Sequence, residues 1–369
     1  MSVIDSALAQ VKQLHPYTPG KPVEELEREL GISNAIKLAS NENPLGCSQL
    51  VQRAIKRASS HIELYPDANA FYLKRALAER LAVDAGQITI GNGSNDVLDL
   101  LARTFLDSSA EAIYSEHAFL VYALVVQACG AKARVAPALP EDAEQAYGHD
   151  LSAMLALISE NTRVIFIANP NNPTGTWLKR TELKDFIDAV PGHIAVIVDE
   201  AYFEYVDEND YPDALQWLGE FPNLIVTRTF SKIYGLAGLR VGYAISSAEV
   251  NDLLNRLRQP FNANTLALAA AIASLADQEF VKASLDNNQK GLRQLADYFD
   301  SKNISYIPSV ANFLSVKFGR QSEDIYANLL QQGIIVRPLG NYNLSEYLRI
   351  TIGTEQQLAL LMEKLDGLL

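Results

Sequence analysis

Arg163-Val-Ile-Phe-Ile-Ala168, which is apolar from Val164 onward, and Ile194-Ala-Val-Ile-Val198 are short runs of the kind that form buried β-strands. Between them, the segment from Leu178 to Val190 carries apolar residues at helical spacing. Buried strands joined by a helical crossover indicate a mostly parallel sheet with helices on both faces. We therefore predict an α/β fold.

The same alternation extends outward from these two runs. Further strand candidates lie at 87–90, 111–115, 132–136 and 223–227. From about Asn264 the pattern changes to a long helical region and then to strand candidates at 304–307, 313–318, 334–337 and 347–352. We expect an N-terminal arm and part of a small domain in residues 1–45, a large domain in 46–263, and a small α+β domain in 264–369. The proline-rich stretch from His15 to Pro22 is expected to be extended.

Composition excludes several classes of protein. The 369 residues carry a formal net charge of -13, which repels nucleic-acid backbones and anionic lipid. Cys47 and Cys129 are the only cysteines, too few for a disulfide scaffold or a cysteine zinc site. No leader or apolar run long enough to span a bilayer is visible. We expect a cytoplasmic protein with no metal site and no nucleic-acid or membrane partner.

Residues that follow strands in a parallel sheet are the first candidates for a binding site, because ligands bind beyond the carboxyl ends of the strands. The first strand candidate leads into Gly91-Asn-Gly-Ser-Asn-Asp96 and then into a helical pattern. A glycine turn at a helix N-terminus presents free N–H groups to a phosphate. A plain tight turn explains the segment equally well. A dinucleotide site fits less well, because Asp96 replaces the third glycine of that fingerprint.

Two other strand ends carry polar side chains. Asn169-Pro-Asn-Asn-Pro-Thr-Gly175 is compatible with an ordinary double turn, but it would also fix amide groups at the mouth of the crevice. Asp199 ends an apolar strand, where a carboxylate needs a partner. A helix cap is one explanation, and a protonated pyridine nitrogen is another.

The last strand end precedes Ser231-Lys232, with Arg240 beyond a glycine-rich bend. An isolated lysine is usually a solvated surface group. An ammonium placed among other cations and apolar walls has a lowered pKa, which frees the amine for Schiff-base formation.

Taken in order, these segments resemble the class I/II group of fold-type I aminotransferases, which depend on pyridoxal 5'-phosphate. The resemblance covers nearly the whole chain, to Gly353. Three further segments are similar to the histidinol-phosphate aminotransferase branch: Ala39-Ser-Asn-Glu-Asn-Pro-Leu-Gly46, Tyr65-Pro66-Asp67 and Leu348-Arg349-Ile-Thr-Ile-Gly353. The implied fold is a large cofactor-binding domain with a mostly parallel sheet and a smaller α+β domain.

The resemblance implies cofactor-binding roles for individual residues. Lys232 would form the Schiff base with the cofactor and move the proton, and Asp199 would hold the proton on the ring nitrogen. Asn172 and Tyr202 would bond the phenolic oxygen, and Phe119 would stack on the ring. The phosphate would be held by Gly93, Ser94, Ser231, Arg240 and, across an expected homodimer, Tyr65 of the partner subunit.

The resemblance also implies substrate-binding roles. Arg349 would bind the anionic end of the substrate through a bidentate fork, although an arginine on a short strand more often forms a salt bridge. Tyr17 and Arg337 match positions expected near the distal phosphate of the substrate. Asn41 would line the substrate entrance.

The implied reaction converts L-histidinol phosphate and 2-oxoglutarate into imidazole-acetol phosphate and L-glutamate, a step of histidine biosynthesis. An aromatic amino acid aminotransferase is the nearest alternative, because an imidazole pocket and a phenyl pocket are both flat. A decarboxylase of the same fold is a further alternative. A nicotinamide oxidoreductase built on Gly91 and Gly93 would leave Lys232 and Asp199 without a role.

Overall fold

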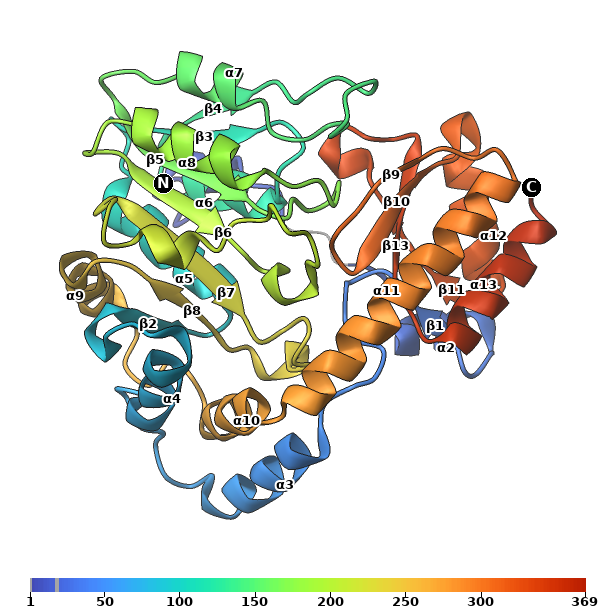
Figure 1. Cartoon of the computed structure of the whole chain (residues 1–369), viewed down its shortest axis with the longest axis horizontal. Helices are drawn as coiled ribbons and strands as arrows, with labels where there is room; N and C mark the ends of the chain where they lie inside the picture. The colour runs from blue at the N-terminus through green and yellow to red at the C-terminus, as the bar shows by residue number, and fades with distance from the viewer. Residues whose placement is uncertain (1, 17–19) are drawn as a thin grey trace.

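The computed structural model describes residues 2–16 and 20–369 (Figure 1). Within this part of the chain, the larger domain is built on a seven-stranded sheet of order β2-β8-β7-β6-β5-β3-β4. All pairs are parallel except those made by β8, which runs antiparallel to both neighbours. The strands are β2 (Ile88–Gly91), β3 (Glu111–Ser115), β4 (Lys132–Ala136), β5 (Thr162–Ala168), β6 (Ala195–Asp199), β7 (Leu224–Thr229) and β8 (Gly242–Ile245).

Helices cover both faces of this sheet because successive side chains of a strand point to opposite faces. In β5, Ile165 and Ile167 pack into one apolar core, and Val164 and Phe166 pack into another. The first core also contains residues of α3 (Gln49–Ala58), α4 (Phe71–Leu81), α7 (Leu151–Ala156), α8 (Arg180–Ala189) and α10 (Thr265–Ala276). The second contains residues of α5 (Ser94–Phe105), α6 (Leu120–Ala128) and α9 (Ala248–Leu257).

The smaller domain lies beside the carboxyl ends of the parallel strands, with the long helix α11 (Gln278–Ser301) running from one domain to the other (Figure 1). Its antiparallel sheet has the order β12-β13-β10-β9, and β1 pairs with β11 in a separate parallel pair. The elements are α2 (Val23–Leu30), β1 (Ile36–Lys37), β9 (Tyr306–Ile307), β10 (Phe313–Lys317), α12 (Ser322–Gln331), β11 (Ile334–Ile335), β12 (Arg337–Pro338), β13 (Tyr347–Thr351) and α13 (Glu355–Asp366).

The strand candidates of the sequence are confirmed, with three differences. The run 334–337 divides into β11 and β12, which join different sheets. Strand β1 was not expected, since it has only two residues. Strand β8 was not expected either, since its four residues follow a glycine-rich bend and carry no strand pattern of their own. All three differences concern strands that tertiary pairing defines more than local sequence.

Helix α10 begins after the expected domain boundary at 263/264, yet it packs against α3 and α4 of the larger domain (Figure 1). The bounds of the domains stay a prediction. At the N-terminus, the short helix α1 (Ala9–Lys12) contacts α6. Among the described residues, no helix is long and apolar enough to cross a membrane.

Candidate active site

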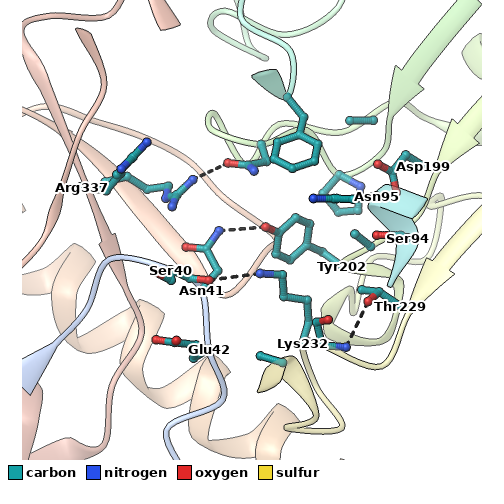
Figure 2. A pocket seen from close by; sticks show the side chains of 18 of the residues that line it. Ser40, Asn41, Glu42, Ser94, Asn95, Asp199, Tyr202, Thr229, Lys232 and Arg337 are labelled. Atoms are coloured by element: carbon teal, nitrogen blue, oxygen red, sulfur yellow. Dashed lines mark hydrogen bonds between the residues drawn. The ribbon is translucent and has the colours of Figure 1, made fainter. Parts of the chain in front are cut away.

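A cavity of about 240 Å³ lies between the carboxyl edge of the large sheet and the smaller domain. The sheet supplies one wall because the loops after β2, β3, β5, β6 and β7 all emerge at this edge. Segments of the smaller domain close the opposite side, where Figure 2 shows Arg337 facing across from Asp199. Predicted residues that line the cavity are Asn41, Ser94, Phe119, Asn172, Asp199, Tyr202, Ser231, Lys232, Arg240, Arg337 and Arg349.

Lys232 lies on the loop after β7, and its amine points into the cavity (Figure 2). Its Nζ donates a hydrogen bond to the carbonyl oxygen of Ser40 at 3.1 Å. Burial, followed by the positive charges of Arg349 and Arg240, lowers the pKa of Lys232 from 10.5 to about 7. A large fraction of the amine is therefore neutral near pH 7, as a nucleophile or base requires.

Asp199 is the last residue of β6 and is buried. The hydroxyl group of Tyr122 donates to its Oδ2 at 2.9 Å, and that of Thr227 donates to its Oδ1 at 3.0 Å. Burial raises the pKa of Asp199, and these two hydrogen bonds oppose the rise. The carboxylate is thus held firmly without a cationic side chain bonded to it, so it can pair with a positively charged group of a ligand.

Glu200, the next residue, takes no part in this wall. Its carboxylate is buried against Arg228, with Oε2 2.6 Å from Nη2. Adjacent carboxylates at the end of one strand therefore have separate roles, one toward the cavity and one in an internal ion pair.

The corner formed by Gly93, Ser94, Ser231 and Arg240 has the properties of a phosphate site. Ser94 is the first residue of α5, so the free N–H groups of a twelve-residue helix lie at this corner. Gly93 has φ of +87°, and a methyl group added to it would overlap the guanidinium of Arg240. Arg240 also donates to the hydroxyl group of Ser231 at 3.2 Å. Only glycine allows the cation this close to the helix end.

Arg349 fixes the orientation of the Asn172 amide. Its Nη1 donates to Oδ1 of Asn172, which leaves the Asn172 Nδ2 group available to a ligand in the cavity. Nη2 of Arg349 donates to the carbonyl oxygen of Ala39 at 2.8 Å. The Nε atom of Arg349 is buried and has no hydrogen-bond partner among the described residues. A buried guanidinium with an unused donor indicates an anion-binding position.

Arg337 stands directly opposite Arg349 in the antiparallel pair of β12 and β13. Both side chains are largely buried, at 7% and 5% exposed, and both line the cavity. Like charges at facing positions destabilise a sheet, and an anion shared between them removes that repulsion. The pair is therefore a candidate second anion site, on the smaller domain.

Two of the predicted residues that the structure describes are not part of the cavity lining. Gly93 belongs to the phosphate corner through its contact with Arg240 but does not itself line the cavity. Tyr65 is 82% exposed and stacks on Phe261, with ring centroids 4.7 Å apart, in a separate surface hollow. Tyr17 lies outside the described residues.

Several contributing residues escaped the sequence reasoning. Tyr122 lies in an apolar run, which is typical of core residues, and Thr227 looks like an ordinary strand residue. Thr229 lines the cavity, and its hydroxyl oxygen accepts a hydrogen bond from the Ser231 N–H at 3.1 Å. Strand ends rich in threonine are a weak signal, because threonine favours strands in any case.

The cavity offers a phosphate corner, a buried acid, amide and phenol donors, an aromatic face from Phe119 and a neutral amine. This set matches a planar heteroaromatic aldehyde that carries a phosphate and a basic ring nitrogen. Within the described chain, no group of His, Cys, Asp and Glu side chains could hold a metal ion.

Comparisons with known proteins agree with this geometry. The model of the family "Aminotransferase class I and II" matches residues 33–365. The chain is 53% identical, over the full length of both proteins, to "Histidinol-phosphate aminotransferase 2" of Methylococcus capsulatus. It is 52% identical to the protein of the same name from Pseudomonas aeruginosa, with 95% of each chain covered.

Solved structures show the same similarity. The histidinol-phosphate aminotransferase of Sinorhizobium meliloti, in complex with pyridoxal-5'-phosphate, superposes with a TM-score of 0.89 at 28% identity. The match covers 99% of this chain and 100% of that one. An aspartate aminotransferase of Thermus thermophilus has a TM-score of 0.84 at 19% identity and covers 98% of this chain and 99% of its own, a likeness in fold alone.

Proposed function

We propose that this chain, which belongs to the aminotransferase class I and II family, transfers the amino group of L-histidinol phosphate to 2-oxoglutarate. The products are imidazole-acetol phosphate and L-glutamate. The names of relatives about half identical over the full length support this reaction. The observation on the molecule that supports it best is the facing pair of Arg337 and Arg349 in the cavity wall.

Pyridoxal 5'-phosphate is the cofactor that fits the residues of the cavity. When bound, it supplies an electron-withdrawing ring that makes the carbon next to the amine acidic. Asp199 would hold the proton on the ring nitrogen, and Asn172 and Tyr202 would donate to the phenolic oxygen. Phe119 would cover the ring. The phosphate would be held by Gly93, Ser94, Ser231 and Arg240.

Lys232 would hold the cofactor covalently when no substrate is present. Once released by an incoming amine, Nζ of Lys232 would take the proton from the α-carbon of the substrate and return it to the cofactor. A lowered pKa suits this exchange, because a base with a pKa near the working pH both accepts and donates protons readily.

The two arginines suit a reaction whose substrates carry different anions. Histidinol phosphate bears a phosphate ester and no carboxylate, whereas glutamate and 2-oxoglutarate bear two carboxylates. Two adjacent forks with bidentate capacity can bind either kind of group. A substrate such as phenylalanine, with one carboxylate, would leave part of the paired positive charge unmatched. Arg349 and Arg337 are therefore proposed to bind the substrate anion, with Asn41 at the cavity wall.

We also propose that the active form is a homodimer. Exposed apolar side chains line the surface hollow at Tyr65, and contiguous exposed apolar side chains mark interaction sites. The exposed apolar residues in this lining are Ile62, Leu64, Tyr65 and Phe261. Tyr65 would then reach the phosphate corner of the partner subunit. Light scattering on the purified protein tests this proposal, and Tyr65→Phe should weaken cofactor binding if Tyr65 supplies a hydroxyl group.

The visible spectrum of the cofactor-loaded protein tests the reaction. L-Histidinol phosphate, L-phenylalanine and L-glutamate are added separately, and the loss of absorbance of the lysine-bound cofactor reports each half-reaction. We expect histidinol phosphate to act at a far lower concentration than phenylalanine. The reverse order would move the assignment to aromatic amino acids. Absence of any cofactor absorbance would overturn the cofactor assignment.

A further inference from the structure

Asn41 occupies an unusual position between the two domains. It is 1% exposed, with φ of +56°. Its Nδ2 lies 2.8 Å from the hydroxyl oxygen of Tyr202, and its Oδ1 lies 3.1 Å from the hydroxyl oxygen of Thr351 (Figure 2 shows the first contact). A single amide thus joins the last residue of β13 to the tyrosine beside Lys232.

The contacts of Thr351 determine which way this amide faces. The backbone N–H of Asn41 donates to the Thr351 hydroxyl oxygen at 2.9 Å. The Thr351 hydroxyl group must therefore direct its own hydrogen elsewhere, and Oδ1 of Asn41 is the acceptor. A flipped amide would leave this buried hydrogen without an acceptor, which is unfavourable. The oxygen of the amide consequently faces Thr351, and the nitrogen faces Tyr202.

The direction of the Tyr202 hydroxyl group follows from the same chain of contacts. Its oxygen accepts a hydrogen bond from Asn41, so its hydrogen has to point away from Asn41. Tyr202 lines the cavity, and burial raises its pKa, so the group stays protonated. None of the described residues accepts this hydrogen.

We propose that Thr351 and Asn41 are positioning residues that direct the hydroxyl hydrogen of Tyr202 into the cavity, toward the phenolic oxygen of the cofactor. This inference rests on the proposed cofactor. It gives Asn41 a role other than lining an entrance. We call the hydrogen-bonded series Thr351, Asn41 and Tyr202 the relay. It starts on β13, two residues beyond Arg349, so one strand carries both the proposed anion-binding group and the first member of the relay.

The Thr351→Val variant removes the hydroxyl group at nearly constant volume and frees the amide to turn. Tyr202 can then donate to Oδ1 of Asn41 instead of to the cofactor. A phenolic oxygen that loses a donor holds more negative charge and retains the proton on the nearby nitrogen that joins Lys232 to the cofactor. We expect the pKa of that nitrogen to rise by up to about one pH unit, toward its value in the Tyr202→Phe variant. Thr351→Ser keeps the hydroxyl group and should keep the pKa.

The measurement is the pH titration of visible absorbance in the cofactor-loaded protein without substrate. It does not depend on which amine the enzyme prefers, so an error in the proposed substrate would leave it intact. Absence of the cofactor absorbance would instead be a failure of the proposed function. An unshifted pKa in Thr351→Val, with a shifted one in Tyr202→Phe, would overturn the relay.

Asn41→Asp gives a second test, and the variant should fold because asparagine and aspartate both tolerate positive φ. The carboxylate can only accept from Tyr202, so the hydroxyl hydrogen turns away from the cofactor. The added charge raises the same pKa through space, and the double variant with Tyr202→Phe measures that contribution alone. The relay predicts a larger shift from Asn41→Asp when Tyr202 is present. Equal shifts in both backgrounds would contradict it.

Asn312→Ala is the matched structural control. Nδ2 of Asn312 donates to the backbone oxygen of Asn41 at 3.0 Å, so this residue braces the backbone of the segment without bonding to the side-chain amide of Asn41. We expect a lower unfolding temperature and an unchanged pKa. A shift as large as that of Thr351→Val would mean that loss of bracing alone explains the effect, and the relay would be wrong.

Discussion

The cavity has two candidate anion sites that are built differently. The site on the large domain combines the N-terminus of α5, a serine hydroxyl and Arg240, which lies against Gly93. The site on the smaller domain consists of two facing guanidinium groups, Arg337 and Arg349. Backbone N–H groups are fixed in place and suit one permanent phosphate, whereas arginine forks accept phosphate and carboxylate alike. The comparison suggests a resident anion on one side and exchanging anions on the other.

The largest effect is expected at the residue between these two sites. Lys232→Ala should lower turnover about 10,000-fold or more, because it removes the proposed base and the covalent attachment. Both anion sites remain, so the cofactor should still bind without a covalent bond. Steady-state kinetics and equilibrium dialysis measure the two properties. Lys184→Ala, at an exposed lysine paired with Glu220, is the control. Turnover near that of the control would contradict the assignment of Lys232 as the base and the cofactor attachment point.

The same substitution at the two anion sites separates their roles. Arg349→Lys keeps the charge but loses the fork, and should lower kcat/KM about 100-fold for both substrates with cofactor affinity unchanged. Arg240→Lys should weaken cofactor affinity about tenfold and leave KM for substrates nearly constant once the cofactor saturates the protein. If the two variants gave the same pattern, the distinction between resident and exchanging anions would be wrong.

Gly93→Ala tests the close approach at the resident site. The new methyl group would meet the Arg240 guanidinium, and φ of +87° is strained for alanine. We expect cofactor affinity to fall about tenfold, an effect of the size that a displaced charge-assisted hydrogen bond produces. Gly238→Ala is the control, since a methyl group there would meet no atom within 4 Å. Equal affinities in the two variants would show that the Gly93 corner does not hold the phosphate.

The smallest effect concerns pH. Only the neutral amine of Lys232 attacks an aldehyde, so the rate of cofactor uptake by the cofactor-free protein should rise with pH and be half-maximal near pH 7. A dicarboxylate bound to Arg349 and Arg337 would offset part of the positive charge near Lys232. The bound dicarboxylate should therefore raise the midpoint of the pH dependence by roughly a few tenths of a pH unit. Stopped-flow absorbance gives both curves, and a midpoint near the ordinary lysine pKa would contradict the burial argument.

The sequence predicted the large-domain wall better than the small-domain wall, for a physical reason. Asn172, Asp199 and Lys232 each follow a strongly apolar strand, and parallel strands bring their carboxyl ends together without further information. The facing of Arg337 and Arg349 depends on the pairing of β12 with β13, and the sequence showed one strand at 334–337 where the structure has two. Register between short antiparallel strands is set by tertiary packing.

The hydrogen-bond donors to Asp199 could not be predicted from the sequence, for another reason. Tyr122 comes from α6, and its apolar ring also packs on Phe166, with centroids 4.7 Å apart. A tyrosine in an apolar helix predicts core packing, and nothing local indicates that its hydroxyl group reaches a carboxylate on another element. Such contacts between distant segments become visible only when the fold is known.

The antiparallel direction of β8 has a consequence for how such a site can be transferred between proteins. Because β8 starts at the edge where β7 ends, residues 230–241 leave that edge and return to it as one long hairpin loop. Lys232 and Arg240 therefore lie on one continuous loop between two neighbouring strands. A loop graft or a recombination event that exchanges 229–242 carries the amine and the phosphate-binding cation in one piece, with their spacing intact. A parallel β8 would have required a crossover helix between them, and the two functions would then be inherited separately.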